Sequence, residues 1–202
     1  MNVNYAYICY FYWFIIMNNT LKYLTMMQLK NILAVLSFCL FTYQLNAKEY
    51  NIIDFGAKSD IGALSTEAIQ KAIDECNAQG GGTVIVPSGN FKTGTIILKS
   101  HVNLFLEQGA TLFGSKNLID YRDIKPGFVS LRTQEATKQL FFAENSENIS
   151  ISGFGEINGQ GKGIKKMSWK DEGITRPHLI RFINCKNVVI ENITLKNSAC
   201  WM

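Results

Sequence analysis

Three pairs of acidic residues lie close together in the sequence and are the first candidates for acid–base chemistry. Acid–base catalysis by two carboxyl groups requires that one donates a proton while the other stays ionised, with both held in fixed positions beside the reacting group. The pairs are Asp54 and Asp60, Asp74 and Glu75, and Asp171 and Glu172. They fall in a leading turn, on a predicted helix and in a polar segment, so we interpret each as a solvated surface or turn feature. No catalytic residue is assigned in residues 48–202.

The histidines, cysteines and glycines do not form the pattern of a metal or nucleotide site. His101 and His178 stand at the edges of predicted strands, and the three cysteines after Ala47 have no framework or zinc-ligand spacing. The stretch "GFGEINGQGKG" departs from a phosphate-binding loop at Glu156 and Gly163. Tight turns explain its glycines better. The sequence predicts no metal and no cofactor.

The charge balance argues against nucleic acid as a partner. The chain has 202 residues and a formal net charge of +4. The charge falls to +2 (18 basic against 16 acidic residues) when residues 1–47 are set aside, because they hold two lysines and no acidic residue. A balance this even lacks the strongly basic surface that nucleic-acid binding requires.

Residues 1–47 differ from the rest of the chain. From Met26 or Met27 onward, a basic start, the apolar run "ILAVLSFCLF" (32–41) and an end at Ala47 have the layout of a secretory signal peptide. A membrane anchor is the alternative interpretation. We therefore expect a mis-called extension at 1–25, a signal peptide at 26–47, and an exported mature chain at 48–202 with no stable membrane span.

One amphipathic helix is predicted at residues 65–79. Ser65 or Thr66 is expected to cap it, and three glycines (80–82) follow it. Its apolar residues recur at the spacing of one helical face. They are Ala68, Ile69, Ala72, Ile73 and Cys76.

After this helix the pattern changes to short apolar strands separated by Gly, Asn or Ser. We predict strands at 83–87, 94–98, 102–107, 110–114, 139–144, 148–153, 178–183, 187–191 and 192–196. Long polar excursions interrupt them at 115–138 and 159–175. No second amphipathic helix lies between them, which argues against a sheet built from β–α–β units.

Two segments resemble each other, "NSENISISGFGEIN" from Asn145 and "NCKNVVIENITLKN" from Asn184. Such repetition is typical of stacked rungs in a parallel β-helix, with the helix at 65–79 as its N-terminal cap. Asn148 and Asn187 are expected at turns with positive φ, with their amides laddered between rungs. The predicted inward residues are Ile149, Ile151, Val188, Ile190, Ile193 and Leu195. The predicted fold class is therefore all-β, a capped parallel solenoid.

Five stretches of the sequence resemble the N-terminal half of glycoside hydrolase family 28, the polygalacturonases and their rhamnogalacturonan-cleaving relatives. They are "YNIIDFGAKSD", "TEAIQKAIDEC", "GGGTVIVPSGNFKTGTIILKSHVNLFLEQGATLFGS", "GFGEINGQG" and "RPHLIRFINCKNVVIENITLKNSACW". They occur in the family's order from about Tyr50 to Trp201. The resemblance implies a right-handed parallel β-helix that is a monomer when full length and that hydrolyses pectic polysaccharide, galacturonan or rhamnogalacturonan.

The catalytic motifs of that family are expected beyond Met202. The resemblance implies an Asn-Thr-Asp-Gly motif, an Asp-Asp pair, a His-Gly and an Arg-Ile-Lys, and none of the four occurs in the sequence. We therefore expect a fold truncated on its C-terminal side, a fragment that is inactive by itself.

Trp201 and Arg176 are the candidates for substrate binding. In the resembled family, the tryptophan at the position of Trp201 leads into the groove, and its flat face suits a sugar ring; plain packing is the alternative. The Arg176 guanidinium is suited to pair with a uronate carboxylate, and a structural bridge to the nearby loop is the competing role. Trp169, with Lys165, Lys166 and Lys170 to attract acidic sugars, is a weaker candidate, and a solvated loop is the alternative interpretation.

Two other functions stay open at this point. A non-catalytic β-helix, such as an adhesin or a fibre stem, would have further rungs without the catalytic motifs. A pectate lyase-like enzyme would cleave by β-elimination on the same fold.

Overall fold

The computed structural model describes residues 13–14, 16–18, 22–23, 26–31, 48–125, 127–128, 137–164 and 176–200. The chain divides into two compact units, Met1–Asn46 and Ala47–Met202. The apolar run at 32–41, on which the predicted signal peptide depends, lies outside the described residues. Among the helices that are described, none has the length and apolar character needed to cross a bilayer.

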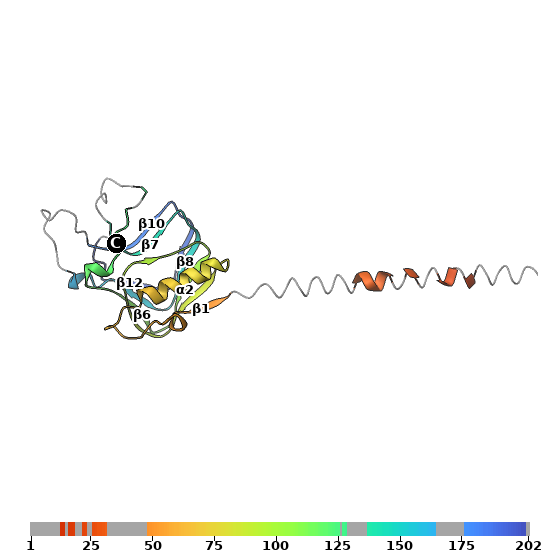
Figure 1. Ribbon diagram of the computed structural model, residues 1–202, viewed down its shortest axis with the longest axis horizontal. Helices are drawn as coiled ribbons and strands as arrows, with labels where there is room; N and C mark the ends of the chain where they lie inside the picture. The colour runs from red at the N-terminus through yellow and green to blue at the C-terminus, as the bar shows by residue number, and fades with distance from the viewer. Residues whose placement is uncertain are drawn as a thin grey trace, which may run out of the picture. The chain divides into compact units, whose positions relative to one another are not determined.

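The second unit is a coil of parallel strands arranged in three sheets (Figure 1). The first sheet has the order β1 (Glu49–Asn51), β2 (Gly82–Val86), β5 (Val102–Leu106), β8 (Glu147–Gly153), β11 (Lys186–Ile190). The second has the order β3 (Gly89–Thr93), β6 (Ala110–Gly114), β9 (Glu156–Asn158), β12 (Thr194–Lys196). The third has the order β4 (Ile96–Ile97), β7 (Gln139–Glu144), β10 (His178–Ile183). The pairings are parallel throughout these sheets, and successive turns of the chain each add one strand to each face. This is the predicted parallel β-helix.

The core consists of columns of apolar side chains that repeat from turn to turn. Cα pairing aligns the residues of each column across neighbouring strands. The columns are Val84–Leu104–Ile151–Ile190 in the first sheet, Phe91–Leu112–Ile157–Leu195 in the second, and Ile96–Phe141–Ile180 in the third. Because like residues stack on like residues, each turn buries its apolar face against the next.

Helix α2 (Thr66–Ala78) covers the first turn of the coil, where it contacts β1, β2, β4 and β5 (Figure 1). Its buried residues are the five predicted from the spacing: Ala68, Ile69, Ala72, Ile73 and Cys76. Ser65 is the N-cap residue, as predicted, but its side chain makes no capping hydrogen bond. Its hydroxyl instead donates to Lys58 O and accepts from Lys58 N, both at 3.2 Å. Helix α2 is therefore held on the coil by the packing of its apolar face, and no hydroxyl among the described residues caps the N-terminus of the helix.

Asparagines form ladders at the corners of the coil. Asn148 and Asn187 have φ of +54° and +51°, and Asn187 Nδ2 donates to Asn148 Oδ1 at 2.9 Å, which confirms the predicted turn role. Asn148 Nδ2 also lies 3.1 Å from His101 Nδ1 in the preceding turn. A second ladder joins Asn184 Nδ2 to Asn145 Oδ1 at 2.6 Å across the same 39-residue step. The repeated sequence segments are therefore adjacent turns of the coil.

Replacing Asn148 tests the two contributions of this ladder separately. Asn148→Ala loses the side-chain hydrogen bonds and replaces asparagine, which tolerates the left-handed region, by a residue that does not, so we expect it to lower the free energy of unfolding by about 2 kcal/mol. Asn148→Gly loses the same hydrogen bonds but adopts the positive φ without a steric penalty, and we expect a loss of about 1 kcal/mol. Urea unfolding followed by circular dichroism measures both. A larger loss for glycine than for alanine would contradict the role assigned to the positive φ.

Both long excursions leave the coil at the same corner, between the second and third sheets. In the first turn only Gly94 and Thr95 separate β3 from β4. In the next two turns, residues 115–138 separate β6 from β7 and residues 159–177 separate β9 from β10. The prediction that the excursions gather on one face is confirmed by these strand positions.

The last described turn is more exposed than predicted. Val188 pairs with Ile149 and Ile190 with Ile151, as expected for inward positions. However, Val188 and Ile190 are 37% and 42% exposed, whereas Ile149 and Ile151 are buried. The reason is that β11 is the final strand of its sheet, so no further strand covers these two side chains.

Candidate functional site

A cavity of about 220 Å³ lies at the corner from which the excursions leave, and we call it the corner cavity. Its lining residues come from the segment after β6, from the end of β9, from the residue that follows β12, and from the stretch that contains the short helix η3 (Gly161–Gly163). The lining residues are Lys116, Asn158, Gln160, Lys162, Gly163 and Asn197. Three side-chain amides and two ammonium groups therefore converge on one hollow, and no carboxylate lines it.

Hydrogen bonds hold the amides of the corner cavity in place. Asn158 Oδ1 accepts from Asn197 Nδ2 and from the backbone N of Gln160, both at 3.1 Å. Asn158 Nδ2 donates to Glu156 Oε1 at 3.2 Å. Gln160 Nε2 donates to Gly114 O at 2.7 Å. The amide wall is therefore fixed by the coil itself, because its residues bond to one another and to neighbouring strands.

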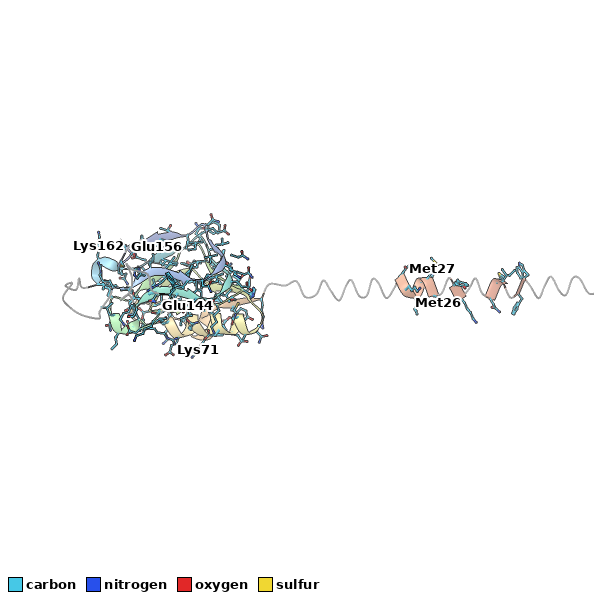
Figure 2. The ribbon with its side chains drawn as sticks, turned by 90° about the horizontal axis from the view of Figure 1, so that it is seen from above. Met26, Met27, Lys71, Glu144, Glu156 and Lys162 are labelled. Carbon is cyan, nitrogen blue, oxygen red and sulfur yellow. The ribbon has the colours of Figure 1, made fainter. Side chains whose placement is uncertain are left out.

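The carboxylate nearest to these amides already has a cationic partner. Glu156 and Lys196 are paired residues in β9 and β12, and Lys196 Nζ forms an ion pair with Glu156 Oε2. Figure 2 shows Glu156 and Lys162 at the same end of the strand-rich unit. In the described part of the chain, neither Lys116 nor Lys162 has an ion-pair partner. The corner cavity thus keeps the charge of its two lysines.

Two glycines beside the corner cavity serve close packing. An ideal Cβ on Gly161 would lie 2.3 Å from Ser198 O, and one on Gly159 would lie 2.8 Å from Asn197 O. Neither has the positive φ that the predicted turn role implies; that role applies to Gly153, with φ of +120°. The glycine-rich stretch therefore lets η3 approach the chain that follows β12.

Arg176 lies next to the corner cavity but does not line it. Its Nη2 donates to Gly161 O, so the guanidinium bridges the start of β10 and η3. Its buried Nε has no hydrogen-bond partner within the described residues. Trp201, Trp169, Lys165, Lys166 and Lys170 lie outside the described residues. The structure thus shows Arg176 in the bridging geometry and leaves its binding role as a prediction.

A second polar cluster joins the two ends of the first excursion. Lys138 Nζ donates to Asp123 Oδ2 at 2.8 Å and to Tyr121 O at 3.3 Å, and Thr137 Oγ1 donates to Asp123 Oδ1 at 2.7 Å. These hydrogen bonds lower the pKa of Asp123 below its usual value. Next to them, burial and then the charge of Arg181 lower the pKa of His178. Because Lys138 and Asp123 pair with each other, we assign this cluster a structural role at the base of the excursion.

Three of the six acidic residues suggested by the sequence have partners within the fold. Asp74 forms an ion pair with Lys99 at 2.8 Å, and Asp60 accepts a hydrogen bond from the backbone of Gly62 at 2.7 Å. Glu75 accepts from Gln79 Nε2 at 3.1 Å. Asp171 and Glu172 lie outside the described residues. Among the described residues, no pair of carboxylates lines the corner cavity.

A second cavity of about 240 Å³ lies at a different corner, where the third sheet passes to the first. Its lining mixes both charges and includes the asparagine ladder. The residues are Ser100, Asn145, Ser146, Glu147, Asn184 and Lys186. Because Asn145 and Asn184 bond to each other there, this cavity is part of the ladder architecture.

Sequence reasoning did not identify the corner cavity. Lys116 lies inside a predicted polar excursion, and Lys162 belongs to the stretch that departs from a phosphate-binding loop, so neither was predicted to bind a ligand. A signal was present, however. Asn158 and Asn197 end the two repeated segments, and they bond across the same 39-residue step as the ladder asparagines.

Comparison with known proteins agrees with this architecture. The family model described as rhamnogalacturonase A/epimerase, pectate lyase-like, matches residues 50–200. The exo-poly-α-D-galacturonosidase of Dickeya chrysanthemi is 40% identical over 158 residues, which cover 74% of this chain and 26% of that protein. Plasmin and fibronectin-binding protein A of Streptococcus pneumoniae is 30% identical over 161 residues, covering 76% of this chain and 21% of that protein.

A solved structure gives the same result in three dimensions. The family 28 exopolygalacturonase of Yersinia enterocolitica superposes with a TM-score of 0.63 at 26% identity, covering 76% of this chain and 36% of that one. The chain thus spans about a fifth to about a third of the length of these relatives. The all-β, right-handed parallel β-helix and the resemblance to glycoside hydrolase family 28 are confirmed. The chain belongs to the rhamnogalacturonase A/epimerase, pectate lyase-like family.

Proposed function

We propose that this chain is the N-terminal part of an exported, polygalacturonase-like hydrolase of pectic polysaccharide. The observation that carries the proposal is the family match over residues 50–200, together with 40% identity to a galacturonan-cleaving enzyme. The corner cavity supports it, because Lys116 and Lys162 line it, no described carboxylate pairs with them, and ammonium groups suit an acidic polysaccharide. Its binding partner would then be galacturonan or rhamnogalacturonan.

The coil is a suitable scaffold for an inverting, two-carboxylate mechanism. Neighbouring parallel strands lie about 4.8 Å apart, so carboxylates two turns apart on one face would be separated by roughly 9.6 Å. That is close to the roughly 6.5–9.5 Å that inversion requires. The described residues offer no such pair at either cavity. We therefore propose that the catalytic carboxylates belong to further turns and that residues 1–202 alone do not hydrolyse pectin.

Hydrolysis of polygalacturonate tests this proposal. The 202-residue chain and a product extended along the same reading frame are incubated with polygalacturonate, and reducing ends are measured. We expect release only by the extended product, with an inverted anomeric configuration by proton NMR. Unsaturated products would show β-elimination and overturn the hydrolase assignment in favour of a lyase. Comparable release by the 202-residue chain would overturn its predicted inactivity.

The export part of the proposal has its own measurement. We expect the exported protein to begin at Lys48, with residues 26–47 removed as a signal peptide. Mass spectrometry of the mature N-terminus tests this, and a retained apolar run would favour the membrane anchor.

A non-catalytic binding protein is the second candidate, favoured by the similarity to the plasmin and fibronectin-binding protein. An extended product that binds immobilised fibronectin and releases no sugar would establish it. Sugar release without fibronectin binding would exclude it.

A further inference from the structure

The corner cavity combines a net positive charge with a rigid amide wall, which is the chemistry of a carboxylate site. Lys116 and Lys162 supply two charged donors that no described carboxylate neutralises. Glu156, which contacts the amide wall through Asn158, is already paired with Lys196. An anion that enters the cavity would therefore gain two charge-assisted hydrogen-bond donors without displacing an internal partner.

The amides add the geometry that a sugar ring requires. Asn158 uses its carbonyl oxygen twice and its amide nitrogen once inside the coil, so it is a fixed wall. The side-chain nitrogens of Asn197 and Gln160 each donate one hydrogen bond within the protein. Asn197 donates to Asn158 Oδ1, and Gln160 donates to Gly114 O. In these bonds the two side-chain oxygens take no part, so they can accept from sugar hydroxyls. Amides and ammonium groups together match a ligand that carries both hydroxyls and a carboxylate.

Gly163 fixes where Lys116 lies. An ideal Cβ on Gly163 would be 2.7 Å from Lys116 Cε and 2.8 Å from Lys116 Cδ. The aliphatic stem of Lys116 therefore packs on the backbone of η3 at Gly163, and Lys116 and Gly163 both line the cavity. A methyl group on Gly163 would displace this flexible stem without removing its charge.

We propose that the corner cavity is a subsite for one uronate residue of the polysaccharide, with Lys116 and Lys162 binding its carboxylate and the Asn197 and Gln160 amides contacting its hydroxyls. The inference rests on the proposed function, because it specifies the acidic substrate that this function implies. It assigns recognition of the acidic sugar to a part of the chain that holds no catalytic carboxylate pair. A methyl-esterified residue would lose the charge and bind poorly there.

Binding of trigalacturonate to the 202-residue chain tests the inference. Nitrogen–proton NMR titration is performed with trigalacturonate and with its fully methyl-esterified form as the neutral probe. We expect the acid to bind about tenfold more tightly, with the largest shifts at Gly163 and Asn197. The double variant Lys116→Met with Lys162→Met should lose about tenfold in affinity for the acid and remain unchanged for the ester. Gly163→Ala, which keeps both charges, should give an intermediate loss.

Lys71→Met is the matched control, because Lys71 is an exposed lysine of α2 and lies apart from Lys162 in Figure 2. It should leave both affinities within twofold of the parent. Equal binding of acid and ester, no measurable binding of the acid, or an equal loss in Lys71→Met would each overturn the inference. Sugar release by the extended product with affinity independent of the two lysines would overturn the subsite alone. Lysine-dependent binding of the acid without any release would overturn the hydrolase alone.

Discussion

Replacing Gly153 by alanine is expected to lower the free energy of unfolding by at least about 3 kcal/mol. Gly153 ends β8 with φ of +120°, and an ideal Cβ there would lie 2.1 Å from Leu106 O in the preceding turn. The backbone is thus in a region that L-residues avoid, and the new methyl group meets a backbone oxygen. Relief requires that β8 and β5 move apart, which breaks their pairing.

Gly80→Ala is the matched control for Gly153→Ala. Gly80 also has a positive φ, +93°, but nothing lies within 4 Å of its ideal Cβ. We expect a loss of only about 1 kcal/mol, since the new residue adds backbone strain without a clash. Urea unfolding of both variants measures the difference. Equal losses would show that close approach between turns does not constrain Gly153.

Replacing Phe141 by alanine should cost about 3–5 kcal/mol. Phe141 is 0% exposed in the middle of β7, where pairing aligns it between Ile96 in β4 and Ile180 in β10. Removing the ring leaves a cavity in the core column of the third sheet, and neighbouring turns cannot close it because their strands are held by hydrogen bonds.

Phe154 provides the control for the aromatic ring itself. It is 67% exposed in the turn after β8, so Phe154→Ala should change the free energy of unfolding by about 0.5 kcal/mol or less. Thermal and urea unfolding give both values. A loss below about 1 kcal/mol for Phe141→Ala would contradict the column packing assigned to the third sheet.

Elements with a local periodic pattern could be predicted from the sequence. The five apolar residues of α2 follow helical spacing, and all five are buried. Strands β6, β7 and β10 have the predicted bounds, because alternating apolar residues and flanking polar turns mark them. The positive φ of Asn148 and Asn187 followed from the conformational preference of asparagine.

Strand β3 was not predicted, and β9 was expected as a short strand without stated bounds, because the stability of both comes from neighbouring turns. "GNFKT" and "EIN" each contain one large apolar residue, which shows no alternation. Phe91 and Ile157 are nevertheless fully buried, since they stack in one column with Leu112 between them. A pattern with one residue per turn repeats only over long distances, and the excursions make its spacing irregular.

The corner cavity was missed for a related reason. Its members come from the segment after β6, from the stretch between β9 and η3, and from the end of β12, so no short motif contains them. Arg176 was identified, but its hydrogen bond to Gly161 O depends on how η3 folds back, which residue types do not specify.

Because both excursions leave from one corner, different parts of the molecule determine the pairing of the strands and the contacts that the excursions make. The straight faces and the asparagine ladders determine which strands pair, although the paired residues Val84–Leu104, Leu104–Ile151 and Ile151–Ile190 lie 20, 47 and 39 residues apart in successive turns. The corner between the second and third sheets accepts two connecting residues in one turn and long segments in the next two. The segments at that corner can therefore be lengthened, shortened or exchanged during evolution, which changes the ligand that they contact and leaves the pairing of the strands intact.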